Sequence, residues 1–349
     1  MPRGSHPGTR QLNVSSTRSR TATGRRLLPP ARLVAPALLV ALVVALLAPV
    51  LVRDARAEEP DYSGWRDLLQ RYVKVQAEKG KPWDSRFDYQ RLYVDEGIIQ
   101  KHRADGLAAL HDRLLSVRPS DLSPAERTAW AINTYNFLVV ERMTLLLLVP
   151  GRKLMRYDSP LQANTVDGAF FAAPVAKVGG RDFSLAGFER WFVYGDTSGN
   201  PTSDGLMGRE RPGDPRLMFA LCKAALCTGP ALPWVFRADS LDAQLDRAVR
   251  MALARPEFVR ADLATGQLDA TNRFFDERAD FGGPELPGVV PLLRKYGTPA
   301  TRKLISARKL TRPSRFFEPD WKLNIYVWPS AKLPGQEGAL AAPEARKSP

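Results

Sequence analysis

The residues of this chain that could do chemistry begin with two asparagines in WAINTYN, residues 130–136. Asn133 and Asn136 are three residues apart, so they share one face of a helix. Asparagine is a poor residue for a helix interior because its amide competes for backbone hydrogen bonds. Among apolar neighbours, at least one amide is expected to be buried and hydrogen-bonded. Two interpretations stay open: a structural clamp on a neighbouring loop, or, together with Tyr135, the lining of a ligand pocket or oxyanion site.

Cys222 and Cys227 are the two cysteines of the chain, five residues apart. In an oxidising compartment they are expected to form a short disulfide, provided that the segment between them is a loop. The alternative is a nucleophilic thiolate at one of them, with Lys223 as the nearest positive charge in sequence. A protonated lysine cannot shuttle the proton as a histidine does. Two cysteines and scattered histidines are a weak zinc signature, so the sequence indicates no metal site and no cofactor.

Three carboxylates are further candidates for a cluster that does acid–base or cation chemistry: Glu189, Asp280 and Asp320. Their spacing does not require such a cluster. Each has a basic residue close by in sequence, such as Arg190 next to Glu189. We therefore expect ion pairs or helix capping for these three side chains, with a shared site as the alternative.

The elements that must position these residues are mostly helices. Ser123 to Glu126 is a capping box with proline at the first helical position, which predicts a long helix that runs to a Val-Pro-Gly stop at 149–151. Apolar residues at helical spacing predict further helices over 65–73, 107–114 and 241–249.

Short strands interrupt the predicted helices. Residues 174–184 read as a β-hairpin that turns at Gly179-Gly180, after which Ser184 caps a helix that carries Glu189. Residues 258–267 read as a second hairpin, and 216–221 as a short buried strand that leads into the cysteines. Helices interleaved with hairpins predict the α+β class, as one helix-rich domain with short β-hairpins.

The amino-terminal residues predict export. Leu33 to Val52 is an uncharged run preceded by seven arginines and no acid, and Ala55-Arg56-Ala57 follows it. This pattern is typical of a secretory signal cleaved after Ala57. Because twenty such residues also span a hydrocarbon core, residues 1–57 are expected to be either a signal peptide or an uncleaved membrane anchor.

Charge and composition define the rest of the chain. Residues 1–57 carry nine arginines and one aspartate, so the formal net charge of +14 is mostly that of the leader. The acids of the remainder are interspersed with its lysines and arginines, which argues against a nucleic-acid partner. We expect one globular domain over 58–328 and a disordered tail over 329–349, where Pro, Ala and charged residues lack periodicity.

Five fragments together resemble the domain of unknown function 547 family, in the same order over about residues 65–325. These fragments are NTYN, VGGRDFSLAGFER, DPRLMFALCKAALCTGP, RFFDERADF and DWKLN. The resemblance implies an exported bacterial protein and no established activity. The chain departs from the family pattern where Met218 and Arg190 stand at positions that are histidine in the family. The cysteines also arrive one residue early, and Ala131 stands where the family has tryptophan.

The sequence therefore predicts an exported or membrane-tethered protein that acts as a binding or accessory module in the cell envelope. A membrane contact through Leu33 to Val52 and a cell-envelope ligand are the expected partners. The alternative is a thiol-dependent hydrolase or acyltransferase with Cys222 or Cys227 as nucleophile and an asparagine at the oxyanion. Asn136→Ala is expected to destabilise the fold more than Glu141→Ala, because Glu141 is expected nearer the solvent.

Overall fold

Helix α6, Pro124–Leu146, is the element around which the other helices pack. In the computed structural model, which describes residues 59–76, 84–96, 105–146, 158–166, 170–195 and 213–326, most of this helix is buried. The predicted capping box is confirmed, because Ser123 N–H donates to Glu126 Oε2 at 2.8 Å and Glu126 N–H donates to Ser123 Oγ. None of the described helices is both long and apolar enough to span a membrane.

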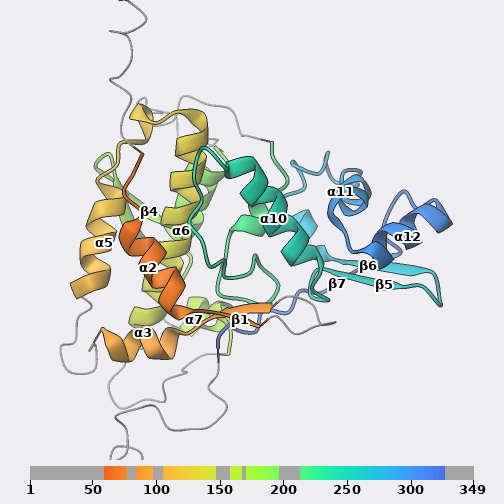
Figure 1. Ribbon diagram of the computed structural model, residues 1–349, viewed down its shortest axis with the longest axis horizontal. Helices are drawn as coiled ribbons and strands as arrows, with labels where there is room; N and C mark the ends of the chain where they lie inside the picture. The colour runs from red at the N-terminus through yellow and green to blue at the C-terminus, as the bar shows by residue number, and fades with distance from the viewer. Residues whose placement is uncertain are drawn as a thin grey trace, which may run out of the picture. The chain divides into compact units, whose positions relative to one another are not determined.

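Four shorter helices belong to the same part of the fold: α2, Ser63–Tyr72; α3, Tyr89–Asp95; α5, Asp105–Leu115; and α7, Pro160–Val166. Helices α3 and α5 contact α6 directly, and α2 contacts α3 (Figure 1). A turn of 3-10 helix, η1 (Pro119–Asp121), precedes α6. The helices predicted over 65–73 and 107–114 are confirmed, with the first ending at Tyr72.

Two antiparallel hairpins lie next to these helices in the sequence. Strand β1, Val73–Gln76, pairs with β2, Asp84–Phe87. Strand β3, Pro174–Val178, pairs with β4, Arg181–Ser184, as predicted, and both glycines of the turn adopt positive φ. Ser184 then caps α8, Leu185–Phe188, by accepting a hydrogen bond from Gly187 N–H. Helix α8 continues into η2, Glu189–Val193, which is a turn of π-helix.

The carboxyl-terminal elements begin with a correction. Residues 216–221 were expected to form a strand, but Leu217–Ala220 is one helical turn, α9, which contacts α10, Leu241–Leu253. An apolar run of this length has no periodicity that separates strand from helix, so the packing against α10 decides its form.

A small sheet follows α10. The predicted second hairpin is confirmed as β5, Val259–Asp262, and β6, Gln267–Thr271. Strand β7, Arg315–Phe317, joins β6 in parallel. Between β6 and β7 lie η3, Asn272–Phe275; α11, Val289–Tyr296; and α12, Pro299–Arg308. The structure is thus an α+β domain, rich in helices and with short strand pairs.

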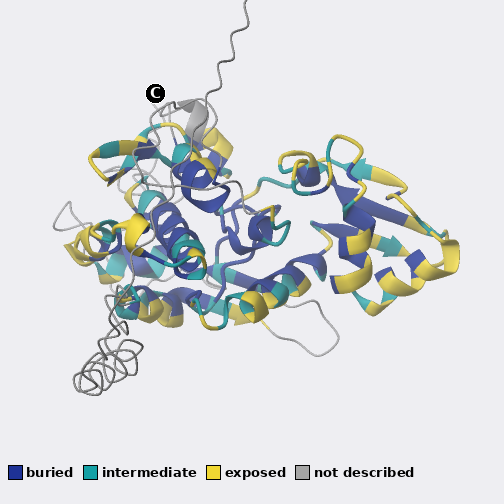
Figure 2. Ribbon diagram, turned by 90° about the horizontal axis from the view of Figure 1, so that it is seen from above, coloured by how far each residue is buried: buried dark blue, intermediate teal, exposed yellow. Residues whose placement is uncertain are grey.

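The apolar side chains form two clusters. The larger one surrounds α6 and holds Trp130, Tyr135 and Phe137, all fully buried. The smaller one lies between the β5–β6–β7 sheet, α11 and α12. Figure 2 shows these buried segments in dark blue. We call residues 221–229, which hold both cysteines, the cysteine segment. It runs between α6 and residues 320–324, and contacts with both set its position.

Candidate functional site

The two asparagines of α6 each hold a distant stretch of backbone. Asn133 Nδ2 donates to Phe236 O at 2.8 Å, and Phe236 N–H donates back to Asn133 Oδ1 at 2.9 Å. Asn136 Nδ2 donates to Ala220 O at 2.9 Å, while Cys222 N–H donates to Asn136 Oδ1 at 2.8 Å. Every one of these amide groups is therefore engaged in a clamp on the segment 220–236.

Residues 320–324, the DWKLN motif, lie against the cysteine segment on its other side. Leu226 N–H donates to Lys322 O, Cys227 N–H donates to Asp320 O, and Asn324 N–H donates to Ala224 O. Gly229 lies so close to Phe219 that a Cβ there would come within 2.4 Å of the Phe219 carbonyl oxygen. Only glycine fits at this position, and the cysteine segment is therefore fixed by backbone contacts on both sides.

The expected disulfide is not formed, because Cys222 and Cys227 are both free and buried. The Cys222 backbone is held by Asn136, and its thiol lies near Tyr89. The Cys227 backbone is held by Asp320 instead, and its thiol lies near Arg273. A loop of four residues between the cysteines was expected to allow the bond, but these separate anchors give the two thiols different surroundings.

Burial raises the pKa of both thiols. It raises the pKa of Cys222 although the Ala224 backbone N–H and Arg255 act against the rise. It raises the pKa of Cys227 to about 12, although the positive charge of Arg273 lowers it. A nucleophilic cysteine needs a thiolate at neutral pH, which these surroundings disfavour. His111, the histidine that the structure describes, is instead paired with Glu141 at 2.7 Å.

Glu189 forms a buried ion pair that the sequence did not predict. Its Oε1 lies 2.6 Å from Lys223 Nζ, and its Oε2 accepts a hydrogen bond from the Tyr135 hydroxyl at 3.2 Å. Burial, with the charge of Glu189, raises the pKa of Tyr135 well above its usual value. The π-helical turn directs Glu189 inward, so its partner is Lys223 from the cysteine segment rather than its neighbour Arg190.

The three candidate carboxylates do not share a metal-binding cluster. Asp320 pairs with Lys322 at 3.8 Å, as expected, while Glu189 pairs with Lys223. Asp280 lies in the turn that follows η3. Within the described ranges, no three or more His, Cys, Asp or Glu side chains come together as a group that could hold a metal ion.

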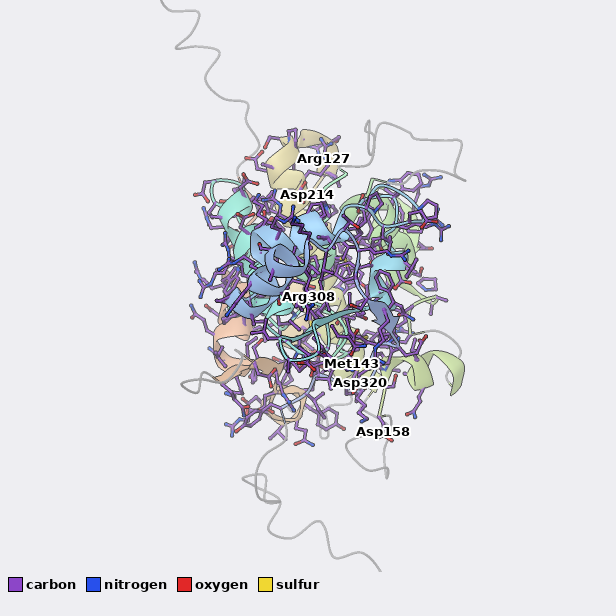
Figure 3. All side chains as sticks on the ribbon, turned by 90° about the vertical axis from the view of Figure 1, so that its right-hand side faces the viewer. Arg127, Met143, Asp158, Asp214, Arg308 and Asp320 are labelled. Carbon is purple, nitrogen blue, oxygen red and sulfur yellow. The ribbon has the colours of Figure 1, made fainter. Side chains whose placement is uncertain are left out.

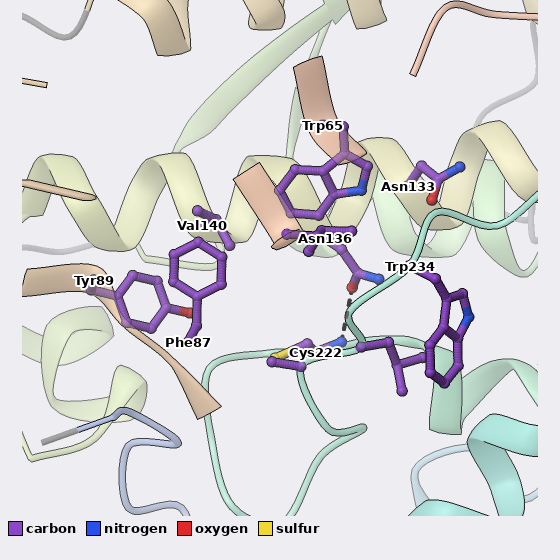
Figure 4. Close-up of a pocket in the computed structure, with 11 residues that line it drawn as sticks. Trp65, Phe87, Tyr89, Asn133, Asn136, Val140, Cys222 and Trp234 are labelled. Atoms are coloured by element: carbon purple, nitrogen blue, oxygen red, sulfur yellow. Dashed lines mark hydrogen bonds between the residues drawn. The ribbon is translucent and has the colours of Figure 1, made fainter. Parts of the chain in front are cut away.

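A pocket lies between α2, β2, α3, α6 and the cysteine segment (Figure 4). The free space inside it is about 20 Å³, and the pocket is partly open to solvent. Three predicted residues line it, namely Asn133, Asn136 and Cys222. Tyr135, Glu189, Cys227, Asp280 and Asp320 do not belong to its lining.

Four of the eleven residues that line the pocket are aromatic, and the sequence did not reveal this. The ring side chains of the lining are Trp65, Phe87, Tyr89 and Trp234. Phe87 and Tyr89 pack with ring centroids 4.7 Å apart. The Tyr89 hydroxyl is buried and finds no hydrogen-bond partner in the described part of the chain, and Figure 4 shows it beside Phe87 at one end of the pocket. These rings come from three separate stretches, so no local spacing could have grouped them.

Comparison with known protein families gives a match for the middle of the chain. Residues 119–251 match the model of a family described as "Protein of unknown function, DUF547". This match includes α6 with both asparagines, Glu189 and the cysteine segment, whereas Trp65, Phe87 and Tyr89 lie before it. No curated protein and no solved structure gave a match to the chain. Over residues 119–251, the chain therefore matches the DUF547 family, as the sequence motifs indicated.

Proposed function

We propose that the protein is a binding module whose ligand occupies the aromatic pocket. The observation that carries this proposal is the buried hydroxyl of Tyr89, which belongs to the lining of a pocket with four aromatic rings and has no partner of its own. A buried polar group without a partner costs about 1–3 kcal/mol, and a ligand that accepts its hydrogen bond removes that cost.

The lining defines the chemical class of the ligand. Indole and phenyl faces favour flat, largely apolar groups through burial and ring stacking. The Tyr89 hydroxyl adds one hydrogen-bond donor, because burial raises its pKa well above the usual value and keeps it protonated. We therefore propose that a small, mainly apolar end group with one hydrogen-bond acceptor enters the pocket, while the flat remainder of the ligand covers its open side.

The thiol-dependent hydrolase finds less support in this geometry. Both thiols are buried with raised pKa values, and Lys223 is occupied by Glu189. Asn133 and Asn136 have their amide groups engaged by backbone partners. A general base close to either thiol is not supplied by His111, whose ring is held by Glu141.

The place of action that we propose is the cell envelope. The basic leader, the apolar run Leu33 to Val52 and the Ala-x-Ala triplet support export, either with cleavage or as an anchored form. All of these residues lie outside the described part of the chain. A binding protein in this location would meet envelope components or small molecules that enter from outside.

Binding can be tested with two naphthalenes of similar shape. We expect 2-acetylnaphthalene, which has a carbonyl acceptor, and 2-ethylnaphthalene, which has none, both to bind and to quench tryptophan fluorescence saturably. Tyr89→Phe should weaken binding of the acetyl compound by about three- to tenfold, the effect of one neutral hydrogen bond. It should leave the affinity for the ethyl compound nearly unchanged.

Tyr93→Phe is the matched control, because Tyr93 lies on the same helix α3 and is buried, but does not line the pocket. It should alter neither affinity. Lack of saturable binding by both compounds, or an equal effect of the two tyrosine variants, would refute the pocket as a ligand site.

A further inference from the structure

The net positive charge of residues 58–349 comes from one stretch of the sequence. Residues 58–349 carry a formal net charge of +6, with 42 basic and 36 acidic residues. Residues 289–315 contain eight lysines and arginines and no acid. The remainder of 58–349 therefore has a net charge of −2. This segregation contrasts with the interspersed charges that were expected throughout the chain.

The fold places all eight of these side chains on the outside. Helices α11 and α12 pack against each other, and α12 also contacts β5 and β6. Their apolar residues, such as Leu293 and Ile305, are fully buried in the smaller cluster. The eight exposed basic residues are Arg294, Lys295, Arg302, Lys303, Arg308, Lys309, Arg312 and Arg315. Figure 3 views the protein from this end, with Arg308 labelled.

Nearby acids neutralise little of this charge. Arg315 forms an ion pair with Asp269 at 2.8 Å. The other seven form no ion pair with any acid in the described ranges, and we call these seven the α11–α12 basic surface. By contrast, Arg216 near α10 contacts three aspartates, with its pKa raised accordingly. The uncompensated positive potential is thus a property of this surface.

We propose that the α11–α12 basic surface docks on the anionic headgroups of a membrane. Lysines and arginines close to such a surface each contribute about 1 kcal/mol of attraction. Binding of single-stranded nucleic acid would use exposed rings for stacking, but Tyr296, the aromatic residue of 289–315, is buried. The basic surface therefore complements anionic lipid headgroups better than single-stranded nucleic acid.

In the uncleaved, anchored form of the protein, the leader supports this choice of partner. Ten residues separate the apolar run, which ends at Val52, from α2, which begins at Ser63. Fully extended, ten residues span at most about 36 Å. With the run inserted as an anchor, this short connection keeps the basic surface at high effective concentration near the headgroups. The proposal does not depend on the ligand pocket.

The test uses the full chain, leader included, in lipid nanodiscs. Ser306 is exposed on α12, and Ser306→Cys provides a site for an environment-sensitive dye. The parent protein without this substitution shows whether the buried native thiols take up any dye. We expect dye emission to shift to shorter wavelength on nanodiscs that contain phosphatidylglycerol, and not on purely phosphatidylcholine nanodiscs. High salt should reverse the shift.

Two double variants test whether docking depends on this surface or on positive charge anywhere on the protein. Arg302→Gln with Lys303→Gln removes two charges next to the dye, and should lower the ratio of docked to undocked protein about thirtyfold. Arg66→Gln with Arg71→Gln removes the same charge from exposed positions on α2 and should change that ratio less than twofold. Equal effects of the two variants, or equal emission on both kinds of nanodisc, would overturn the proposal.

A nucleic-acid partner is the remaining outcome to exclude. Single-stranded and duplex DNA of about twenty nucleotides are added to protein docked on the anionic nanodiscs. We expect no displacement of the dye from the lipid at micromolar DNA. Tight DNA binding that reverses the emission shift, and that is lost in the Arg302→Gln, Lys303→Gln variant, would reassign the surface to nucleic acid.

Discussion

Asn136 links two backbone groups that are more than eighty residues away in the sequence, Ala220 O and Cys222 N. Asn133 does the same for both backbone groups of Phe236. A side-chain amide is suited to this task because it offers one acceptor and two donors in a fixed plane. The position of the cysteine segment, and of the pocket wall that it provides, depends on these four bonds.

We predict that Asn136→Ala lowers the free energy of unfolding by about 1–3 kcal/mol, because it leaves the Cys222 N–H and Ala220 C=O without partners. Urea unfolding followed by circular dichroism measures the change. The matched control is Asn272→Ala in η3, where the structure gives the amide no side-chain hydrogen bond. It should cost less than about 0.5 kcal/mol. Equal losses for the two variants would contradict the clamp.

Glu141 is a poor control for this experiment, contrary to the sequence-based expectation. Its side chain is only 13% exposed and accepts a hydrogen bond from His111. Glu141→Ala therefore removes an interaction of its own.

The cysteines give a second prediction at this scale. Because burial raises the pKa of Cys227 to about 12, three units above the usual 9.0, its thiolate fraction at pH 8 is about a thousandfold lower than that of a free cysteine. We expect iodoacetamide to modify neither cysteine of the native protein within hours, and both at once in urea. Mass mapping of the labelled peptides distinguishes the two sites. Rapid labelling of either native thiol would favour the hydrolase.

At the scale of elements, α6 is bound to its neighbours by charged pairs as well as by apolar packing. His111 of α5 and Glu141 of α6 are 2.7 Å apart, and Glu189 of η2 bonds to Tyr135 of α6 and to Lys223. Removing one partner of a buried pair strands the other charge, whereas exposed pairs such as Lys177 and Asp182 contribute little. The pair of Glu189 and Lys223 thus fixes η2 to the cysteine segment.

The link between α5 and α6 makes stability depend on pH. The hydrogen bond to Glu141 raises the pKa of His111 above its usual 6.5. The folded state therefore holds this proton more tightly than the unfolded state. The stabilisation is complete below about pH 6.5 and is lost as the pH rises through the higher folded value.

We predict that the difference in unfolding free energy between the native sequence and His111→Gln shrinks as the pH is raised from 5.5 to 8.5. Urea unfolding at one-unit intervals measures it. Glu141→Gln is the control, because it removes the carboxylate that raises the histidine pKa. It should flatten the same pH dependence. A difference that grows with pH would show that His111 is bound in its neutral form.

At the scale of the whole molecule, the chain separates its charges. The leader carries nine arginines, and the α11–α12 basic surface carries the excess of the remainder. If the apolar run stays in the membrane, both basic regions belong to a protein held at a lipid surface. The aromatic pocket is built by other elements, α2, α3 and α6 among them.

The leader provides the prediction that belongs to this scale. We expect the exported protein to begin at Glu58, because Ala55-Arg56-Ala57 fits the small-x-small pattern before a cleavage site. Amino-terminal sequencing after expression in a bacterial host checks this. Ala57→Leu should block cleavage, while Ala77→Leu, beyond the site, should not. Recovery of intact Leu33 to Val52 from the membrane fraction of the native sequence would establish the anchor instead.

The sequence by itself determined the elements whose signals are local. The capping box at Ser123 fixed the start of α6, and Gly179-Gly180 fixed the turn between β3 and β4, because each signal acts over only a few residues. Together with the apolar spacing of the helices, these signals were enough for the fold class. The order of the motifs was enough for the family.

Only the tertiary structure decided the site. The contacts of Asn133 and Asn136 reach residues 84 to 103 positions away, and four rings from separate elements line the pocket. The cysteines stayed apart because different partners hold each of them, and 216–221 became a helical turn because α10 covers it. Such long-range contacts depend on how several elements pack at once, and no short stretch of sequence records that packing.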